Sequence, residues 1–310
     1  MKQERWNAGL IPDQTGRVFV VTGAGSGLGL ATAHALARRG ARVVLAVRDT
    51  EKGRRAAATI TGDTPDARLE VRHVDLADLG SVRAFADALR ADHSHVDVLV
   101  NNAGIMAPPR TLSPQGHELQ FATNHLGHFA LTGLLFDLLA EGVDPRVVTV
   151  SSPNHRQGRI AFDDVDGERA YSPMGHYNQS KLANAVFGHQ LHLRLAGAGS
   201  PVRSVLAHPG YTATGLQKGT PVGTVRLLYG RLLAPLAQKP ADGALSQLYA
   251  AIEPGVRGGE FIGPGGAGEL RGAPTRVTLA PRAKDAATGR RLWELSERLT
   301  GVRFPALTAG

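Results

Sequence analysis

The sequence predicts an α/β fold in which one parallel sheet is doubly wound, with helices on both of its faces. Short apolar runs alternate along the chain with segments of helical periodicity, as expected when crossover helices join parallel strands. The strands lack the polar alternation of a half-exposed sheet, which indicates that both faces are covered. With 310 residues, of which 42% are hydrophobic, the chain is long enough to bury such a core.

The expected elements follow one another from residue 18 onward. Strands are expected at Val18–Thr22, Arg42–Val47, Leu69–Val74, Val96–Val100, Val147–Val150, Val202–Ala207 and Glu260–Ile262. Helices are expected at Leu28–Arg39, from about Glu51, around Ser81–Leu89 and Tyr177–Leu195, and at Ala241–Ile252 and Ala283–Leu299. We predict a single domain over residues 1–310, with a core of about 16–263 and a C-terminal extension of about 264–310.

Composition argues against several classes of protein. The chain has no cysteine, which excludes disulfides, thiolate metal sites and cysteine nucleophiles. The net charge is +8, but basic and acidic residues are interspersed, so we expect no nucleic-acid partner. Residues 1–14 show no apolar signal core, and no apolar stretch reaches the ~20 residues that span a bilayer. We expect a cytoplasmic protein with no membrane partner.

A glycine-rich segment, Thr22–Gly29, lies between the first expected strand and the first expected helix. Glycines let the backbone turn sharply and approach a pyrophosphate, and the helix N-terminus offers free N–H groups. The spacing is not the strict G-x-G-x-x-G, so its position after a strand supports the interpretation. We predict a dinucleotide site of a Rossmann fold, formed by Gly23, Gly25, Ser26, Gly27, Leu28 and Gly29.

The spacing T-G-x-x-x-G-x-G resembles the short-chain dehydrogenase/reductase family, and further motifs follow in that family's order. These motifs are Asn101–Gly104 after the fourth strand, then Asn124, Ser152, Tyr177 and Lys181. The runs NHLGHF at 124–129, YNQSKLAN at 177–184 and HPG at 208–210 resemble the retinol-dehydrogenase-like members. The resemblance implies an oxidoreductase that interconverts a carbonyl and an alcohol with a nicotinamide cofactor.

The end of the second strand bears on the choice of cofactor. NAD enzymes place a carboxylate there for the adenosine ribose, but this chain reads Ala46-Val47-Arg48-Asp49. The guanidinium of Arg48 suits a 2′-phosphate, as in NADP-using relatives. Asp49 would favour NAD unless it caps the following helix. We expect NADP(H), with NAD(H) as the alternative.

The resemblance also assigns further contacts with the cofactor. Asp75 would face the adenine amino group, with a helix cap as its alternative role, and Leu76 would supply a backbone contact. The remaining expected contacts are Asn102, Ala103, Gly104, Tyr177, Lys181, Pro209, Gly210 and Thr214, with Thr212 as the rival hydroxyl. Asn101 is expected to support the sheet.

Tyr177 and Lys181 are four residues apart in a predicted helix and therefore share one face. A free tyrosine has a pKa of about 10, too high for efficient base chemistry, and a nearby ammonium lowers that pKa. We predict that Tyr177 is the general acid/base and that Lys181 lowers its pKa. The resemblance adds a hydrogen bond from Lys181 to the nicotinamide ribose.

Two polar residues complete the expected catalytic set. Ser152 ends a strand, where its hydroxyl could polarise the substrate oxygen; the family pattern favours it over Ser151. A serine hydrolase is disfavoured because no G-x-S-x-G turn is present. By resemblance, Asn124 holds a water that links the lysine to solvent, with a buried structural amide as the alternative.

Three histidines, His125, His128 and His155, invite a metal interpretation. The first two are three residues apart, but no carboxylate or third histidine has ligand spacing with them. We expect packing roles and no metal.

Some features depart from the family pattern or stay open. Gly25 stands where relatives have Asn, Pro153 after Ser152 is unusual, and 154–175 resembles the insertion of the retinol-dehydrogenase-like group. Residues of about 211–238 are expected to form a substrate loop that favours a partly hydrophobic substrate, with a surface insertion as the alternative. Relatives often dimerise through the helices carrying Asn124 and Tyr177, so the resemblance allows a homodimer.

The expected function is an NADP(H)-dependent oxidoreductase acting on a small carbonyl or alcohol. The alternatives are an NAD-dependent alcohol dehydrogenase of the same family and a noncatalytic NADP-binding sensor or scaffold. A binding module would have no need of Ser152, Tyr177 and Lys181 together, which argues against the last alternative.

Overall fold

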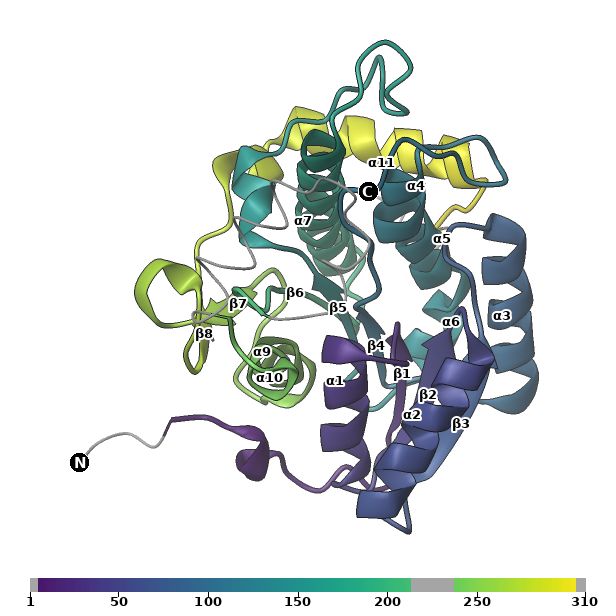
Figure 1. Cartoon of the computed structure of the whole chain (residues 1–310), viewed down its shortest axis with the longest axis vertical. Helices are drawn as coiled ribbons and strands as arrows, with labels where there is room; N and C mark the ends of the chain where they lie inside the picture. Colours follow the sequence, from purple (N-terminus) through teal and green to yellow (C-terminus); the bar gives the residue numbers. More distant parts are fainter. Residues whose placement is uncertain (1–4, 213–236, 305–310) are drawn as a thin grey trace.

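One eight-stranded sheet forms the centre of the molecule (Figure 1). The computed structural model describes residues 5–212 and 237–304. The strand order is β3-β2-β1-β4-β5-β6-β7-β8, and every neighbouring pair is parallel except β7 and β8. The strands are β1 (Val18–Thr22), β2 (Arg42–Val47), β3 (Arg68–His73), β4 (Val98–Asn101), β5 (Arg146–Val150), β6 (Arg203–Ala207), β7 (Phe261–Pro264) and β8 (Pro274–Arg276). The prediction of a doubly wound parallel sheet is confirmed, but the antiparallel edge strand β8 was not predicted.

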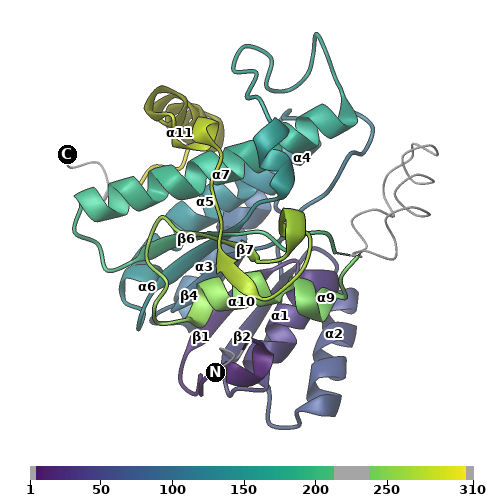
Figure 2. The ribbon, with the colours of Figure 1, turned by 90° about the vertical axis from the view of Figure 1, so that its left-hand side faces the viewer.

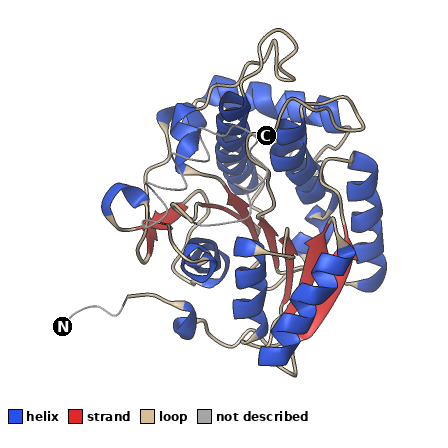
Figure 3. Ribbon diagram, in the orientation of Figure 1, coloured by secondary structure: helices blue, strands red, loops and turns tan. Residues whose placement is uncertain are grey.

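Helices cover both faces of this sheet (Figure 3). The longer helices are α1 (Gly27–Ala37), α2 (Thr50–Asp63), α3 (Leu79–Asp92), α5 (Gly127–Leu134), α7 (Pro173–Gly197), α10 (Leu245–Ile252) and α11 (Ala286–Thr300). The short ones are α4 (Leu119–Phe121), α6 (Phe136–Ala140) and α9 (Pro240–Gly243). Among the described residues, no helix is both long and apolar enough to cross a bilayer.

The alternation of side chains along each strand builds two separate cores. Val21 and Val43 pack with residues of α1, α2 and α10. Their neighbours Val20 and Val44 point the other way and pack with residues of α3, α5 and α7. Both faces of the sheet are therefore buried, which explains the continuous apolar runs in the sequence.

The C-terminal helix α11 lies against α7, as both views show (Figures 1 and 2). Trp293 of α11 contacts Phe129 of α5 and Phe187 of α7, with ring centroids 5.2 and 6.0 Å apart. Phe304 adds a fourth ring, 4.8 Å from Trp293. The described part of the extension thus packs against α5 and α7, and the homodimer stays a prediction.

Candidate active site

The glycine-rich loop turns between β1 and α1 at the carboxyl edge of the sheet. Gly23 has φ +70°, and a Cβ atom there would lie 3.1 Å from the Cα atom of Ala103. A Cβ on Gly29 would lie 2.5 Å from the carbonyl oxygen of Gly23. The loop therefore requires glycine at both positions because its own backbone and the segment after β4 lie too close for a side chain.

Thr22 connects this loop to the segment that follows β4. Its Oγ1 accepts the backbone N–H groups of Asn102 and Ala103, each at 2.9 Å. The Nδ2 atom of Asn102 donates to the carbonyl of Thr22 at 2.7 Å, and Gln247 of α10 donates to Asn102 Oδ1 at 3.2 Å. The glycine loop and Asn102–Ala103 thus form one hydrogen-bonded unit, as expected for two walls of a single nucleotide site.

The N-terminus of α1 is suited to an anion. Helix α1 begins at Gly27, and Ser26 at its N-cap makes no side-chain hydrogen bond to the first turn. The first N–H groups of the helix therefore have no side-chain cap and point toward the loop. Leu28 follows in the first turn, partly buried against the core.

Two charged side chains, Arg48 and Asp49, follow the end of β2. The Arg48 guanidinium has no partner among the described residues, whereas the Asp49 carboxylate caps α2. Arg48 is exposed, and no other described residue forms a hydrogen bond or ion pair with it. Asp49 is the N-cap of α2 and accepts the backbone N–H of Lys52 at 2.9 Å. A Cβ on Gly25 would lie 3.5 Å from Cγ of Lys52. Lys52, which the sequence interpretation missed, therefore passes beside the glycine loop.

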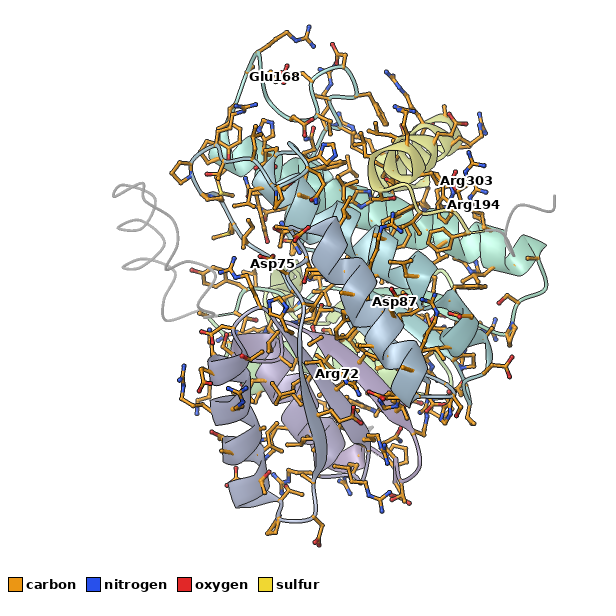
Figure 4. All side chains as sticks on the ribbon, turned by 90° about the vertical axis from the view of Figure 1, so that its right-hand side faces the viewer. Arg72, Asp75, Asp87, Glu168, Arg194 and Arg303 are labelled. Carbon is orange, nitrogen blue, oxygen red and sulfur yellow. The ribbon has the colours of Figure 1, made fainter. Side chains whose placement is uncertain are left out.

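Asp75 lies beyond the end of β3, farther toward the carboxyl edge than Arg72 (Figure 4). Its Oδ1 accepts the N–H of Ala77 at 3.0 Å. The cap of α3 is Asp78, which accepts from Gly80 at 2.9 Å. Asp75 is thus not a helix cap, and its second carboxylate oxygen has no hydrogen bond within the described residues. The backbone of Leu76 packs against Gly127, where a Cβ would collide with the Leu76 carbonyl.

Ser152, Tyr177 and Lys181 come together where β5 meets α7. Tyr177 and Lys181 are buried in α7, and the Ser152 hydroxyl lies near enough to the Tyr177 phenol to lower its pKa. The Nζ atom of Lys181 donates to the carbonyl of Val150 at 3.2 Å and lies 5.9 Å from the Tyr177 ring centroid. Ser151 Oγ donates to the Lys181 carbonyl at 2.8 Å, so this serine joins β5 to α7.

Burial dominates the protonation of both α7 residues. It raises the pKa of Tyr177 to about 12, against the opposing effect of the Ser152 hydroxyl. It lowers the pKa of Lys181 to about 8. The net direction for the tyrosine is upward because burial disfavours the phenolate, and the expected lowering of its pKa by the Lys181 ammonium stays a prediction. Tyr177 therefore holds its proton at neutral pH.

Asn124 lies in a π-helical turn, Ala122–Leu126, just before α5. Its Oδ1 accepts the N–H of Ile105 at 2.8 Å, and its Nδ2 donates to the Ile105 carbonyl and to Ser180 Oγ. A Cβ on Gly104 would lie 3.1 Å from Asn124 Oδ1 and 3.6 Å from Lys181 Nζ. The amide thus holds the segment after β4 beside the lysine; a water relay stays a prediction.

The loop after Ser152 contains Pro153, one of the residues that depart from the family pattern. Pro153 opens a 3-10 turn over Pro153–Gln157, and Ser152 Oγ accepts the N–H of Asn154 at 3.2 Å. Proline is well suited to the first position of such a turn because its fixed φ matches. Farther along, Glu168 lies near the tip of a projecting loop (Figure 4).

The histidines that suggested a metal are engaged in hydrogen bonds. His128 contacts Thr22 Oγ1 and the Asn124 carbonyl, both at 3.0 Å, and His125 contacts Ser296 Oγ at 2.8 Å. Burial lowers the pKa of His125 to about 3 and that of His128 to about 4. Within the described ranges, no group of three potential ligand side chains gathers as a metal site.

The turn after β6 contains the residues expected near the nicotinamide. Thr212 Oγ1 donates to the Pro209 carbonyl at 3.0 Å. Gly210 has φ +67° and packs against the backbone of Leu270. Thr214 and most of the expected substrate loop lie outside the described residues, so the choice between Thr212 and Thr214 stays open.

Comparison with known proteins identifies the family. A model of the short chain dehydrogenases matches residues 17–222. Retinol dehydrogenase 12 of Bos taurus is 39% identical over 289 residues, which cover 93% of this chain and 88% of that protein. Retinol dehydrogenase 13 of Homo sapiens is 38% identical over 296 residues, covering 94% and 87%. This chain therefore belongs to the short-chain dehydrogenase/reductase family and is an oxidoreductase.

Within the family, the similarity is to the retinol dehydrogenases, as the three sequence runs predicted. Among solved structures, an uncharacterized protein from Mycobacterium Paratuberculosis has 45% identity and a TM-score of 0.81, covering 97% of this chain and 100% of that one. A short chain dehydrogenase from Escherichia coli CFT073, complexed with NADPH, has 25% identity and a TM-score of 0.62, covering 78% and 94%. Proteins of this family use a nicotinamide cofactor.

Proposed function

We propose that this protein reduces an aldehyde or ketone to an alcohol with NADPH, with Tyr177 as the general acid. The observation that supports this most directly is the placement of Ser152, Tyr177 and Lys181 at the carboxyl edge of the sheet. That edge also carries the glycine loop, and ligands of such sheets bind where the strand order reverses. In this sheet the reversal lies between β1 and β4.

The residues present fit a dinucleotide with a 2′-phosphate. The uncapped N-terminus of α1 suits the pyrophosphate, and Asp75 has a carboxylate oxygen available for the adenine amino group. Arg48 has no partner among the described residues, whereas Asp49 is occupied as a helix cap. A guanidinium without a partner at this position supports NADPH over NADH. When bound, the reduced nicotinamide supplies the hydride.

The side chains of this chain supply the proton. Because the pKa of Tyr177 is raised to about 12, its phenol is protonated and can donate to the oxygen of the reduced carbonyl. Ser152 is placed to hold that oxygen by a second hydrogen bond. Lys181, with a pKa of about 8, is largely charged at neutral pH and stabilises the phenolate that remains. With these protonation states Tyr177 can serve as the acid when the carbonyl is reduced.

The substrate is proposed to be a partly hydrophobic aldehyde, ketone or alcohol. The relatives named retinol dehydrogenases support this class, because retinol is an apolar molecule with one terminal alcohol. Retinal is therefore the first compound to test, beside shorter aliphatic and aromatic aldehydes.

The test begins with titration of the purified protein by NADPH and NADH, followed by reduced-nicotinamide fluorescence. A panel of aldehydes and ketones is then assayed with the wild type and with Tyr177→Phe. We expect NADPH to bind more tightly than NADH, and Tyr177→Phe to lose about 10²–10⁴-fold in kcat with its affinity for NADPH retained. Failure to bind either nucleotide, or full activity in Tyr177→Phe, would refute the proposal.

A further inference from the structure

Two buried histidines pack against Phe261, the first residue of β7. His155 and His208 are both fully buried, with ring centroids 5.2 and 5.0 Å from that of Phe261. His155 belongs to the loop that begins with Ser152, and His208 begins the turn that contains Pro209 and Gly210. The two rings therefore connect the catalytic serine to the opposite wall of the proposed nicotinamide site.

Backbone N–H groups set a different tautomer in each histidine. Ala280 donates its N–H to Nε2 of His155 at 3.1 Å, so Nδ1 carries the proton and donates to the Ser152 carbonyl at 2.6 Å. Gly210 donates its N–H to Nδ1 of His208 at 3.2 Å, so Nε2 carries the proton there. Burial lowers the pKa of both rings and keeps them neutral.

Glu269 joins the two sides. Its Oε2 accepts the Nε2–H of His208 at 3.0 Å. The same carboxylate accepts Nη2 of Arg156 at 2.8 and 2.9 Å, and Arg156 directly follows His155. Glu269 holds this place in a turn where its own φ is +56°, an uncommon value for a residue with a side chain. No catalytic or cofactor role was expected for this residue from the sequence.

We propose that Glu269 is a positioning residue that fixes the Ser152 loop relative to the His208–Gly210 turn. The proposal rests on the proposed reductase function, in which those two segments border the same reacting centre. Small displacements of reacting groups reduce rates strongly, so a link between the two walls matters for turnover. The C-terminal extension would then contribute to catalysis as well as to folding.

The hydrogen-bond chemistry of this position requires a carboxylate. Both partners of Glu269, the Arg156 guanidinium and the His208 Nε2–H, are donors. Oε2 accepts from both donors, and Oε1 accepts from Arg156 Nη2 as well. In a glutamine one of these two oxygens becomes an NH₂ group, which would lie donor to donor against Arg156 Nη2 or against both donors. His208 cannot adapt by moving its proton, because Nδ1 already accepts from Gly210.

Glu269→Gln is therefore the test variant, and Glu260→Gln is its matched control. Glu260 is also partly buried and pairs with Arg276 at 2.9 Å, but none of its contacts reaches the Ser152 loop or the 208–210 turn. Steady-state kinetics with NADPH, thermal unfolding and the Kd for NADPH are measured for both variants. The ligand-free proteins are also labelled with ¹⁵N-histidine, and NMR reports the tautomers of His155 and His208.

We expect Glu269→Gln to lower kcat about ten- to a hundredfold with KM and the NADPH Kd within about threefold, because positioning is lost but not binding. The His208 resonances should change as well. Glu260→Gln should keep kcat and both tautomers. The inference is overturned if Glu269→Gln keeps full kcat, or if both variants lose kcat equally. A wild type without turnover would refute the proposed function, while the His208 resonances would still show whether Glu269 holds the Nε2–H of that ring.

Discussion

The two halves of the carboxyl edge are built by different means. Around β1 and β4, the loop is shaped by its own backbone: Gly23 and Gly29 allow close approach, and Thr22 binds adjacent N–H groups. Around β5 to β8, side chains from distant segments set the geometry, with the buried His155 and His208 and the partly buried Glu269 as the connections. The nucleotide half thus depends on glycine and backbone, whereas the substrate half depends on tautomers and charge.

The largest expected effect is acid sensitivity, and it comes from buried histidines in both halves, because His128 contacts Thr22 and His208 contacts Glu269. Burial lowers the pKa of His125 to about 3 and those of His128 and His208 to about 4, while unfolded histidine titrates near 6.5. Below about pH 6.5 the unfolded chain therefore binds more protons than the folded chain. The free energy of unfolding has its full value above that pH and falls by several kcal/mol in total as the pH drops toward 4. Urea unfolding at a series of pH values measures the slope. A variant at an exposed histidine, His73→Gln, should keep the same slope, and stability that is flat between pH 6.5 and 4 would contradict the expectation.

A methyl group added to the glycine loop should weaken cofactor binding. In Gly29→Ala the new Cβ would meet the Gly23 carbonyl at 2.5 Å, so the loop must shift. We expect a loss of about 1–3 kcal/mol in stability, together with at least tenfold weaker NADPH binding. Thermal unfolding and fluorescence titration measure the two effects. Gly62→Ala is the control, because a Cβ there meets nothing within 4 Å; equal effects in both variants would refute the argument.

The choice between cofactors should depend on Arg48. Removing a charge-assisted contact with a 2′-phosphate costs about 1.5–3 kcal/mol, or roughly ten- to a hundredfold in affinity. Arg48→Ala should weaken NADPH binding by that factor and leave NADH binding unchanged. Arg54→Ala serves as the control, since Arg54 is exposed on α2 and pairs with Glu51. Equal weakening for both nucleotides would show that Arg48 does not contact the phosphate.

The smallest effect is expected at Asp49. Asp49 is the N-cap of α2, so its replacement by alanine should lower the free energy of unfolding by about 1 kcal/mol. The ratio of NADPH to NADH affinity should stay the same, because the carboxylate serves the helix. A selective loss of NADH binding in Asp49→Ala would instead assign it to the ribose.

The contrast between geometry set by the local backbone and geometry set by distant side chains also explains what could be predicted from the sequence. The seven parallel strands and the glycine loop are local patterns of apolar runs and turns, so they were predictable. Strand β8 has only three residues and no apolar run, and it forms because it pairs with β7. Spacing placed Tyr177 and Lys181 together but could not show their burial, which raises the pKa of the tyrosine. Glu269 lies 113 residues from Arg156, and no local pattern joins them.

The packing of α11 on α7 also has an optical consequence. The chain has two tryptophans: Trp293 is buried against the helix that carries Tyr177, and Trp6 lies half-buried near the N-terminus. In a protein with Trp6→Phe, the tryptophan emission would come only from beneath the catalytic helix. Its emission maximum would be blue-shifted while α11 is docked and would move to longer wavelengths when α11 detaches. The fold thus contains a built-in fluorophore for the contact between the C-terminal extension and the catalytic core.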